Sequence, residues 1–290
     1  MGSLYGFELE SELPLRRLNR APGERGTLLI EVAREPLAAP VGEPVSVLED
    51  EAGMRWYASY ETRDGCMLVL PPSGSFLLEP GTGRVVVDAG DGDPDLLEHR
   101  IASSAVCTLL SLRGDLVLHA SGVEVEGRAV LFCGPTGRGK SSLVRALGES
   151  GRRVVGEDGI CVSLAGGAPT AFPGARGIRV RRRGESGGVS PDLVPDPGPG
   201  EPSPSPLAAI VLLRERGGAL DVEALEPVRA LPLLTPNLIH NGSRGEIGGA
   251  FSLLAGALRT VPAFAASLPD DLAALPDAAA RLLDAVAVRG

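Results

Sequence analysis

Apolar residues at the start of the chain occur in short runs that turn-forming clusters separate. Four such runs are rich in the β-branched and aromatic residues typical of strands, and they cover residues 27–32, 54–60, 66–70 and 84–88. The clusters between them are rich in glycine and proline. This pattern predicts a β-rich module over residues 1–92. It contains no convergent set of chemically active side chains, which favours a scaffold or a partner-docking module.

The pattern changes to helical spacing after residue 92. Asp93 can cap a helix, Pro94 suits its first turn and Gly114 suits its end. The residues at helical spacing form one mostly apolar face, made of Leu97, Ile101, Ala105, Thr108, Leu109 and Leu112. The sequence therefore predicts an amphipathic helix. His99 lies near its start, where we expect a surface residue rather than a ligand.

Strand-like and helical segments alternate through the rest of the chain. Strands are predicted at 115–120, 122–125, 129–133, 152–156, 160–164, 207–213 and 261–265. Helices are predicted directly after residue 141 and at 227–234, 249–259 and 276–288. The alternation predicts an α/β domain over residues 93–290. Within it, residues 184–206 contain seven prolines, which predicts a mobile loop.

One stretch of this domain has the spacing of a phosphate-binding loop, G-x-x-x-x-G-K-[ST]. It consists of Gly134, Pro135, Thr136, Gly137, Arg138, Gly139, Lys140 and Ser141, and Ser142 follows it. A predicted strand precedes the loop and a predicted helix follows it, which is the context that the motif requires. Backbone N–H groups of such a loop surround phosphate oxygens, and the helix N-terminus adds partial positive charge. We therefore expect residues 134–142 to bind a nucleotide.

The lysine of this motif is unusual in the composition of the chain. Lys140 is the only lysine among 28 basic residues, and the others are arginines. A compact ammonium fits inside a tight loop where a planar guanidinium does not. We expect Lys140 to reach the β- and γ-phosphates and the hydroxyl of Ser141 to bind Mg²⁺. The alternative is a chance match in a glycine-rich chain.

Two carboxylates, Glu157 and Asp158, follow the next predicted strand. A helix connects this strand to the loop strand, so the two are expected in one sheet with their carboxyl ends at the same edge. Neighbouring strand residues point to opposite faces, so only one carboxylate can face a metal directly unless the strand has ended. We predict that Asp158 accepts the proton of the nucleophile. Glu157 is predicted to bind Mg²⁺ directly or through water, with Asp158 as a further candidate ligand; the alternative is a solvated acidic turn.

Two further positions carry a titratable ring or a dense charge. His119 lies on a strand two before the loop, where a histidine is more often a satisfied core residue. The segment 176–183 is the only dense run of arginines in the chain. It can contact phosphate or an acidic substrate, or it can be a solvated face, and the residues alone do not decide between these.

Composition narrows the class of function. The net charge is −9 and aromatic residues make up 3% of the chain, which argues against general binding to nucleic acid or anionic membranes. The apolar runs are shorter than the roughly 20 residues of a spanning helix, and the N-terminus lacks the pattern of a signal peptide. No C-x-x-C pair occurs, which argues against a zinc site and fits a reducing cytoplasm. The four cysteines are Cys66, Cys107, Cys133 and Cys161.

Four segments taken in order resemble one known family. They are 118–123 with His119, the loop at 134–142, 154–158 with the acidic pair, and 176–178 with Arg176. In this order they resemble the catalytic domain of HPr kinase/phosphorylase. The layout is closer to related kinases of lasso-peptide and other peptide natural-product clusters, in which a β-rich module precedes the kinase core. The loop alone is widely shared, whereas the ordered series is more specific.

The resemblance covers residues 93–270 by motifs and the N-terminal module by layout only. It implies an ATP- and Mg²⁺-dependent kinase acting on a serine of a protein or peptide, and a P-loop kinase core whose mixed sheet is flanked by helices, as in PEP carboxykinase. It places His119 near the γ-phosphate, makes Asp158 the base and puts Arg176 in a mobile segment near the substrate. Family members often form homo-oligomers.

Two departures from the family bear on these expectations. The family usually has two aspartates where this chain has Glu157 and Asp158, so the metal geometry is expected to differ. The long C-terminal signature of the bifunctional enzymes is not recognisable here, so phosphorylase activity is not expected.

Other functions fit part of these features. A phosphate-loop switch would respond to ATP without phosphorylating an acceptor. A small-molecule kinase would use the same fold, and a nucleotide-binding scaffold would leave the work to the N-terminal module. The sequence selects neither the acceptor nor ATP over GTP. The leading prediction is a cytoplasmic protein or peptide serine kinase.

Overall fold

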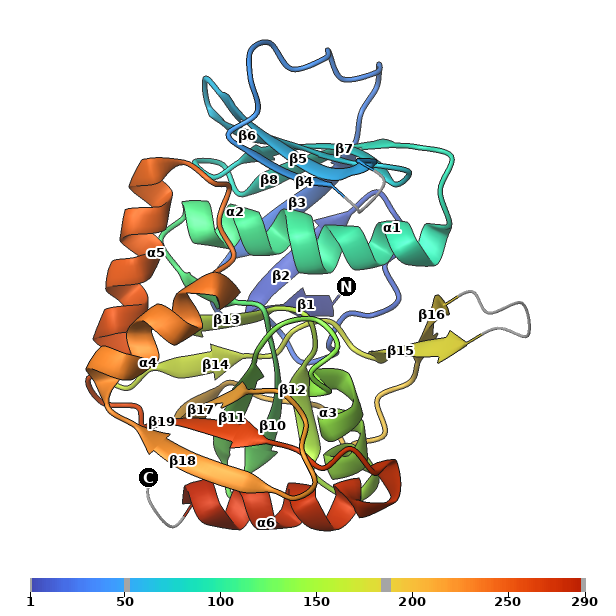
Figure 1. Cartoon of the computed structure of the whole chain (residues 1–290). Coiled ribbons are helices and arrows are strands. Elements are labelled where there is room, and N and C mark those ends of the chain that lie inside the picture. The colour runs from blue at the N-terminus through green and yellow to red at the C-terminus, as the bar shows by residue number, and fades with distance from the viewer. Residues whose placement is uncertain (1, 50–52, 184–188, 288–290) are drawn as a thin grey trace.

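The computed structural model describes residues 2–49, 53–183 and 189–287. These residues form two large mixed sheets and a two-stranded ribbon, and a helical run lies between the large sheets (Figure 1). The chain is thus a mixed α/β protein. Across the described ranges, no helix combines the length and the apolar character that a membrane span requires.

The first sheet is built from the start of the chain. Its described strands lie in the order β1-β2-β3-β8-β7-β6-β5-β4. Their bounds are β1 (Gly2–Leu4), β2 (Phe7–Ser11), β3 (Thr27–Val32), β4 (Ser46–Glu49), β5 (Arg55–Thr62), β6 (Gly65–Leu70), β7 (Gly74–Glu79) and β8 (Arg84–Ala89). From β4 to β8 each strand pairs antiparallel with the next, whereas β3 pairs in parallel with both β2 and β8. The four predicted strands are confirmed as β3, β5, β6 and β8.

The predicted helix is confirmed, with an internal change of winding. It comprises α1 (Pro94–Arg100), a π-helical turn η1 (Ile101–Val106) and α2 (Cys107–Leu112). The Asp93 carboxylate accepts the backbone N–H of Asp95 at 3.0 Å, which satisfies a donor at the helix start. π-Helical turns often occur near functional sites, and this one directly follows the turn that carries His99.

The helical run packs on both large sheets. Its apolar residues, among them Ile101 and Leu109, share one core with Leu68 and Phe76 of the first sheet. The same core includes Val117 and Cys161, which belong to strands of the second sheet. The helix that follows residue 92 therefore buries its surface against both parts of the chain, and the domain boundary at residues 92 and 93 stays a prediction.

The second sheet carries the predicted phosphate loop. The described strands lie in the order β12-β10-β11-β17-β14-β13-β9, and β19 pairs with β17 and β18. Their bounds are β9 (Leu116–Leu118), β10 (Ala120–Val125), β11 (Arg128–Cys133), β12 (Arg153–Gly156), β13 (Ile160–Ser163), β14 (Thr170–Phe172), β17 (Ser205–Leu213), β18 (Asp221–Leu225) and β19 (Ala263–Ser267). The central strand β17 pairs in parallel with β11 and β19, so the loop strand has neighbours from distant parts of the chain.

Helices cover both faces of the second sheet. Val130 and Phe132 of β11 share a core with α3 and α6, whereas Leu131 and Cys133 share a core with α4 and α5. This division follows the alternation of side chains along a strand. The helix bounds are α3 (Lys140–Glu149), α4 (Pro227–Leu234), α5 (Arg244–Ala257) and α6 (Leu275–Ala287), with short turns η2 (Thr235–Asn237) and η3 (Leu272–Ala274). The predicted helices are confirmed, and α5 begins five residues earlier than predicted because Ser243 caps it.

The predicted mobile loop at 184–206 is wrong for part of its length. Residues 189–194 form β16 (Val189–Val194), which pairs antiparallel with β15 (Ile178–Arg183), and residues 205 and 206 begin β17. Pairing between β15 and β16 gives their backbone N–H and C=O groups hydrogen-bond partners, and the proline-rich composition alone did not predict this ribbon. The part at 184–188 lies outside the described residues.

One segment of the first half reaches the second sheet. Residues 12–26, here called the N-terminal arm, connect β2 to β3. The Arg25 guanidinium lies 4.5 Å from the ring centre of Phe7 and 4.7 Å from that of Phe172, and it pairs with Asp115 at 2.5 Å. Nearby, the Tyr5 N–H donates to the Pro173 carbonyl at 2.8 Å. The arm is therefore fixed against the sheet that carries the loop.

Candidate functional site

The phosphate-type loop leaves the sheet where β11 passes close to β17. Gly134 has a positive φ of 138°, and a Cβ there would lie 2.8 Å from the Leu213 carbonyl oxygen. A side chain at this position would therefore push the two parallel strands apart. The Gly134 N–H donates to Oδ1 of Asn237 at 2.8 Å, so a side chain from η2 holds the first residue of the loop.

Lys140 is the first residue of α3 and is buried. Its ammonium donates to the Gly134 carbonyl at 2.6 Å and to the Pro135 carbonyl at 3.4 Å. The charge therefore lies across the opening of the loop, at a helix N-terminus that favours anions. Beside the helix start, Arg216 is so close to Gly139 that a Cβ there would lie 2.6 Å from Nη2. Arg138 of the loop pairs with Glu215 at 2.8 Å.

The predicted common edge for the loop and the acidic pair is confirmed. Strands β11 and β12 both pair antiparallel with β10, and Gly122 of β10 faces Leu131 on one side and Gly156 on the other. The two strands thus run in the same direction, and β12 ends level with Leu131, two residues before the end of β11. β12 ends at Gly156, so Glu157 and Asp158 both lie beyond the strand. Glu157 is buried, whereas the Asp158 side chain is 24% exposed.

Asp158 has an uncommon backbone conformation. Its φ of 62° is in the left-handed region, which aspartate tolerates better than most residues. Two histidines contact it. His119 Nδ1 lies 3.0 Å from the Asp158 carbonyl oxygen, and His99 Nε2 lies 3.4 Å from Oδ2 of the carboxylate. Such conformations persist where surrounding contacts hold them, and they often mark functional sites.

His119 connects the acidic pair to the loop. Its backbone N–H donates to the Asn237 carbonyl at 2.7 Å, and Oδ1 of the same asparagine accepts the Gly134 N–H. Its Nδ1 faces a carbonyl that can only accept, so Nδ1 carries the proton. Burial and the nearby Lys140 charge lower the pKa of His119, while Asp158 raises it in part. The net shift is downward, which favours the neutral imidazole at pH 7.

His119, Asn237 and the loop residues 134–136 and 138 border a cleft of about 630 Å³. Leu213, Leu233 and Pro236 add apolar surface to its lining, and Lys140, Glu157 and Asp158 lie outside that lining. A cleft that joins apolar walls with a few convergent polar groups is the usual form of a small-molecule site. Ser141 lies half-buried in the first turn of α3 and Ser142 is exposed.

The expected surface position of His99 is wrong. Its ring is buried, and the Arg17 guanidinium Nη1 lies 3.2 Å from His99 Nδ1. Arg17 belongs to the N-terminal arm, far from α1 in sequence. The burial of His99 results from contacts with two distant segments, which helical periodicity does not reveal. His99, Arg17 and Asn237 are therefore the site residues that sequence reasoning missed, and no local motif marks them.

The structure places Arg176 beside the site through its backbone only. Its N–H donates to the Arg17 carbonyl at 2.7 Å, and its own carbonyl accepts Arg17 Nε at 2.6 Å. Its guanidinium instead faces the segment after β16, 3.4 Å from Asp196 and 3.3 Å from Glu201. The remaining arginines of the run, 179–183, contribute backbone to β15, and their side chains lie outside the described residues.

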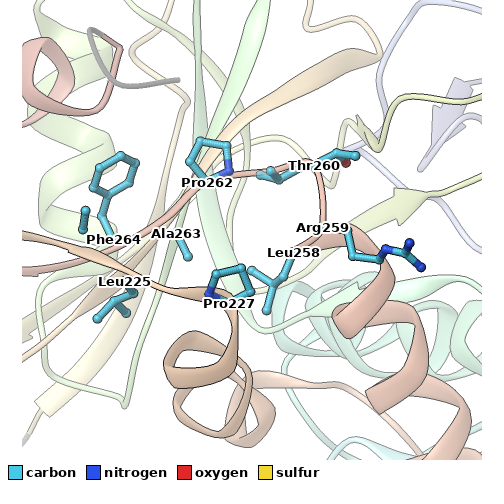
Figure 2. Close-up of a pocket in the computed structure, with 10 residues that line it drawn as sticks. Leu225, Pro227, Leu258, Arg259, Thr260, Pro262, Ala263 and Phe264 are labelled. Atoms are coloured by element: carbon cyan, nitrogen blue, oxygen red, sulfur yellow. The ribbon is translucent and has the colours of Figure 1, made fainter.

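A second pocket, of about 360 Å³, has a different character (Figure 2). This pocket lies near the start of β19. The phosphate-type loop instead follows the end of β11, and both β11 and β19 run parallel to β17. Figure 2 shows Leu225, Pro227, Leu258 and Pro262 in this region, with the Arg259 side chain extending away from them. Its described lining contains neither carboxylate nor histidine, so it does not compete as a candidate for phosphate chemistry.

The similarity that comparisons with known proteins reveal is distant and lies among solved structures. No family model and no curated protein sequence matches the chain. Among solved structures, the HPr(Ser) kinase/phosphatase from Coxiella burnetii is similar at 14% identity with a TM-score of 0.34. The match covers 60% of this chain and 99% of that chain. The chain thus has a weak resemblance to that protein at the level of the fold.

Proposed function

We propose that this chain is an ATP- and Mg²⁺-dependent phosphotransferase that moves the γ-phosphate of ATP to a serine hydroxyl of a protein or peptide. The observation that carries the proposal is the line of contacts from Gly134 through Asn237 and His119 to Asp158. These contacts connect the phosphate-type loop, which borders the cleft, to the backbone of Asp158. Phosphoryl transfer requires little more from a protein than an oriented nucleotide, charge stabilisation and a group that accepts a proton.

Lys140 is the charge that would meet the phosphates. Its ammonium now rests on the carbonyls of Gly134 and Pro135. On binding, Lys140 would exchange these carbonyls for phosphate oxygens, which are stronger partners for an ammonium. Loop N–H groups and the start of α3 would complete the cradle.

Oxygen ligands for Mg²⁺ are available at the same edge of the sheet. Mg²⁺ prefers one or two protein carboxylates together with phosphates and water, so the absence of a preformed cluster of three or more His, Cys, Asp or Glu side chains among the described residues is compatible with it. The Ser141 hydroxyl and the Glu157 carboxylate would hold the ion, with Asp158 as a further candidate. Bound Mg²⁺ would reduce the negative charge on the phosphates.

Asp158 would accept the proton of the attacking serine hydroxyl. Its side chain is partly exposed, so an acceptor can reach it, and the His99 and His119 contacts restrict its position. A neutral His119 would hold the Asp158 backbone without adding a second positive charge beside Lys140. The choice of a serine in a protein or peptide follows the resemblance of the ordered motifs, and Arg176 stays a candidate for contact with that acceptor.

The test is transfer of labelled γ-phosphate to candidate acceptors by the full chain and by two variants. Lys140→Ala and Asp158→Asn are each expected to lower the transfer rate on the order of 10³-fold, because each removes a group that stabilises the transition state. Asp158→Asn should still bind ATP, measured by calorimetry. Arg145→Gln, an exposed change on α3 that breaks only a pair with Glu149, is the matched control and should transfer at the parental rate.

Three outcomes would contradict the proposal. Transfer at the parental rate by both variants would overturn the site assignment. A chain that binds no nucleoside triphosphate would overturn the whole proposal. Nucleotide binding and hydrolysis without label on any protein, peptide or small acceptor would favour the switch over the kinase.

A further inference from the structure

Arg17 of the N-terminal arm lies at the centre of a buried network. Its guanidinium donates to the carbonyls of Arg176 and Gly177, at 2.6 and 3.3 Å, and faces His99 Nδ1 at 3.2 Å. Its backbone is fixed as well, because Oε1 of Glu98 accepts the N–H groups of Arg16 and Arg17 at 2.6 Å each. One side chain therefore touches both α1 and the segment that contains Arg176.

The hydrogen-bond chemistry of this network determines the tautomer of His99. A guanidinium can only donate, so His99 Nδ1 must accept and its proton lies on Nε2. Ser103 supports this assignment: its hydroxyl donates to the His99 carbonyl at 2.7 Å, so its oxygen, 3.2 Å from Nε2, acts as an acceptor there. The Nε2–H group also faces Oδ2 of Asp158 at 3.4 Å.

The two histidines therefore hold the two ends of Asp158 in opposite tautomers. His119 donates from Nδ1 to the Asp158 backbone carbonyl, whereas His99 presents Nε2–H to the carboxylate. The backbone contact restrains the left-handed conformation, and the side-chain contact restrains the rotamer of the carboxylate. A proton acceptor must be held in a productive orientation, and misplacement by about 1 Å can cost roughly 100-fold in rate.

From these contacts we infer that His99 is a positioning residue for Asp158, and that Arg17 fixes the tautomer of His99 and ties it to the backbone of Arg176 and Gly177. The inference rests on the proposed function for its catalytic consequence. The structural part of the inference does not depend on catalysis. It states that one carboxylate is oriented by contacts from the N-terminal arm, from α1 and from the segment before β15.

The first experiment compares steady-state kinetics of His99→Leu, His99→Gln and Arg17→Gln. Loss of an orienting partner of this kind typically costs about 10–100-fold in activity, so we expect His99→Leu to lower kcat by that factor while the KM for ATP stays within about twofold. His99→Gln places an amide N–H near the position of Nε2 and should recover part of the kcat lost in His99→Leu. Arg17→Gln should also lower kcat, because His99 loses its fixed tautomer.

The matched control is Arg16→Gln. Arg16 is exposed, and its hydrogen bond to Glu98 uses only its backbone N–H, so this variant should retain the parental kcat. Parental kcat in both His99→Leu and Arg17→Gln would overturn the inference while leaving the proposed function intact. An equal loss in His99→Gln and His99→Leu would assign His99 a packing role and would also overturn it.

The second experiment reads the tautomers directly and does not depend on activity. The chain has three histidines, so ¹⁵N-labelled imidazole spectra can be assigned by substituting each in turn. We expect the proton of His99 on Nε2 and that of His119 on Nδ1, and we expect Arg17→Gln to mix the two forms of His99. A His99 proton on Nδ1 in the parent would overturn the inference, even if His99→Leu fails to fold. If the parent transfers no phosphate, the proposed function fails and these spectra still decide the contact network.

Discussion

The two large sheets contain similar amounts of strand but differ in how the chain connects them. In the first, β4 to β8 follow one another as antiparallel neighbours, so each strand pairs with the next in sequence. Its charged side chains pair with each other near the surface, as Arg84 does with Glu31 and Glu79. In the second sheet, β11 lies between β10 and β17, and its parallel partner comes from more than 70 positions further along the chain.

This difference explains where the candidate chemistry gathers. Antiparallel hairpins return the chain at once and place their turns at both ends of the sheet. Connections between parallel strands bring the ends of distant segments to one edge, where ligands usually bind. The loop, the acidic pair and Asn237 meet at such an edge. The connectivity of a sheet, more than its strand content, determines where a site can form. The N-terminal arm is the exception, since it carries Arg17 from the first half to this edge.

The largest expected effect tests whether the two sheets open as one unit. Burial raises the pKa of Cys66 in the first sheet and of Cys133 in the second to about 12. At pH 8 a thiol with a pKa of about 12 carries about 10³-fold less reactive thiolate than an ordinary cysteine. We expect both thiols to resist a disulfide reagent at pH 8 and to be labelled at the same slow rate, measured by mass spectrometry of peptides. Early labelling of Cys66 alone would show that the first sheet opens independently.

The next effect concerns stability. Phe76 of the first sheet and Phe132 of the second are both fully buried. Phe76→Ala and Phe132→Ala are each expected to lower the free energy of unfolding by about 3–5 kcal/mol, through lost burial and the cavity left behind. Trp56, the only tryptophan, reports on β5, whereas far-UV circular dichroism reports on the whole chain. Coincident unfolding curves from both signals are expected for each variant. Two separated transitions would contradict the shared core.

The smallest expected effect tests whether only the second sheet contributes to nucleotide binding. Asn237→Ala leaves the buried Gly134 N–H without its acceptor, and Ser59→Ala leaves the Asn241 carbonyl without the Ser59 hydroxyl. Each is expected to cost about 1–3 kcal/mol of stability, because a buried polar group loses its partner. Only Asn237→Ala should also weaken ATP binding, measured by calorimetry, since only it loosens the loop. Equal ATP affinity in both variants would remove Asn237 from the site.

Much of the fold was predictable because local signals decide it. The loop, its strand and its helix follow from glycine spacing and apolar periodicity, and β17 follows from a continuous apolar run. Strands such as β7 and β18 were missed. β7 begins at Gly74, the last residue of the turn cluster 71–74, so the turn signal masked the strand. β18 alternates acidic and apolar residues over only five positions, and it pairs with the edge that β19 offers.

The site was predictable only as far as its motifs extend. The loop and the acidic pair are recognisable from their residue types and spacing. Connectivity rules then place both at one edge of the second sheet. Asn237 and His99 carry no such signal. Asn237 is a single amide in a proline-containing turn. Helical periodicity predicts a surface position for His99, and only the tertiary contacts with Arg17 and Asp158 bury it. Contacts across more than 80 residues depend on tertiary packing, which a single sequence does not display.

The reach of Arg17 has a consequence for how the molecule comes into being on the ribosome. Its partner Arg176 is 159 residues away along the chain. At typical elongation rates this separation corresponds to about 8 to 30 seconds of translation. During that time Arg17 has left the peptidyl-transferase centre but its partner Arg176 has not been synthesised. The contacts that orient Asp158 therefore form late in biosynthesis. The nascent chain can complete its first sheet well before these contacts exist.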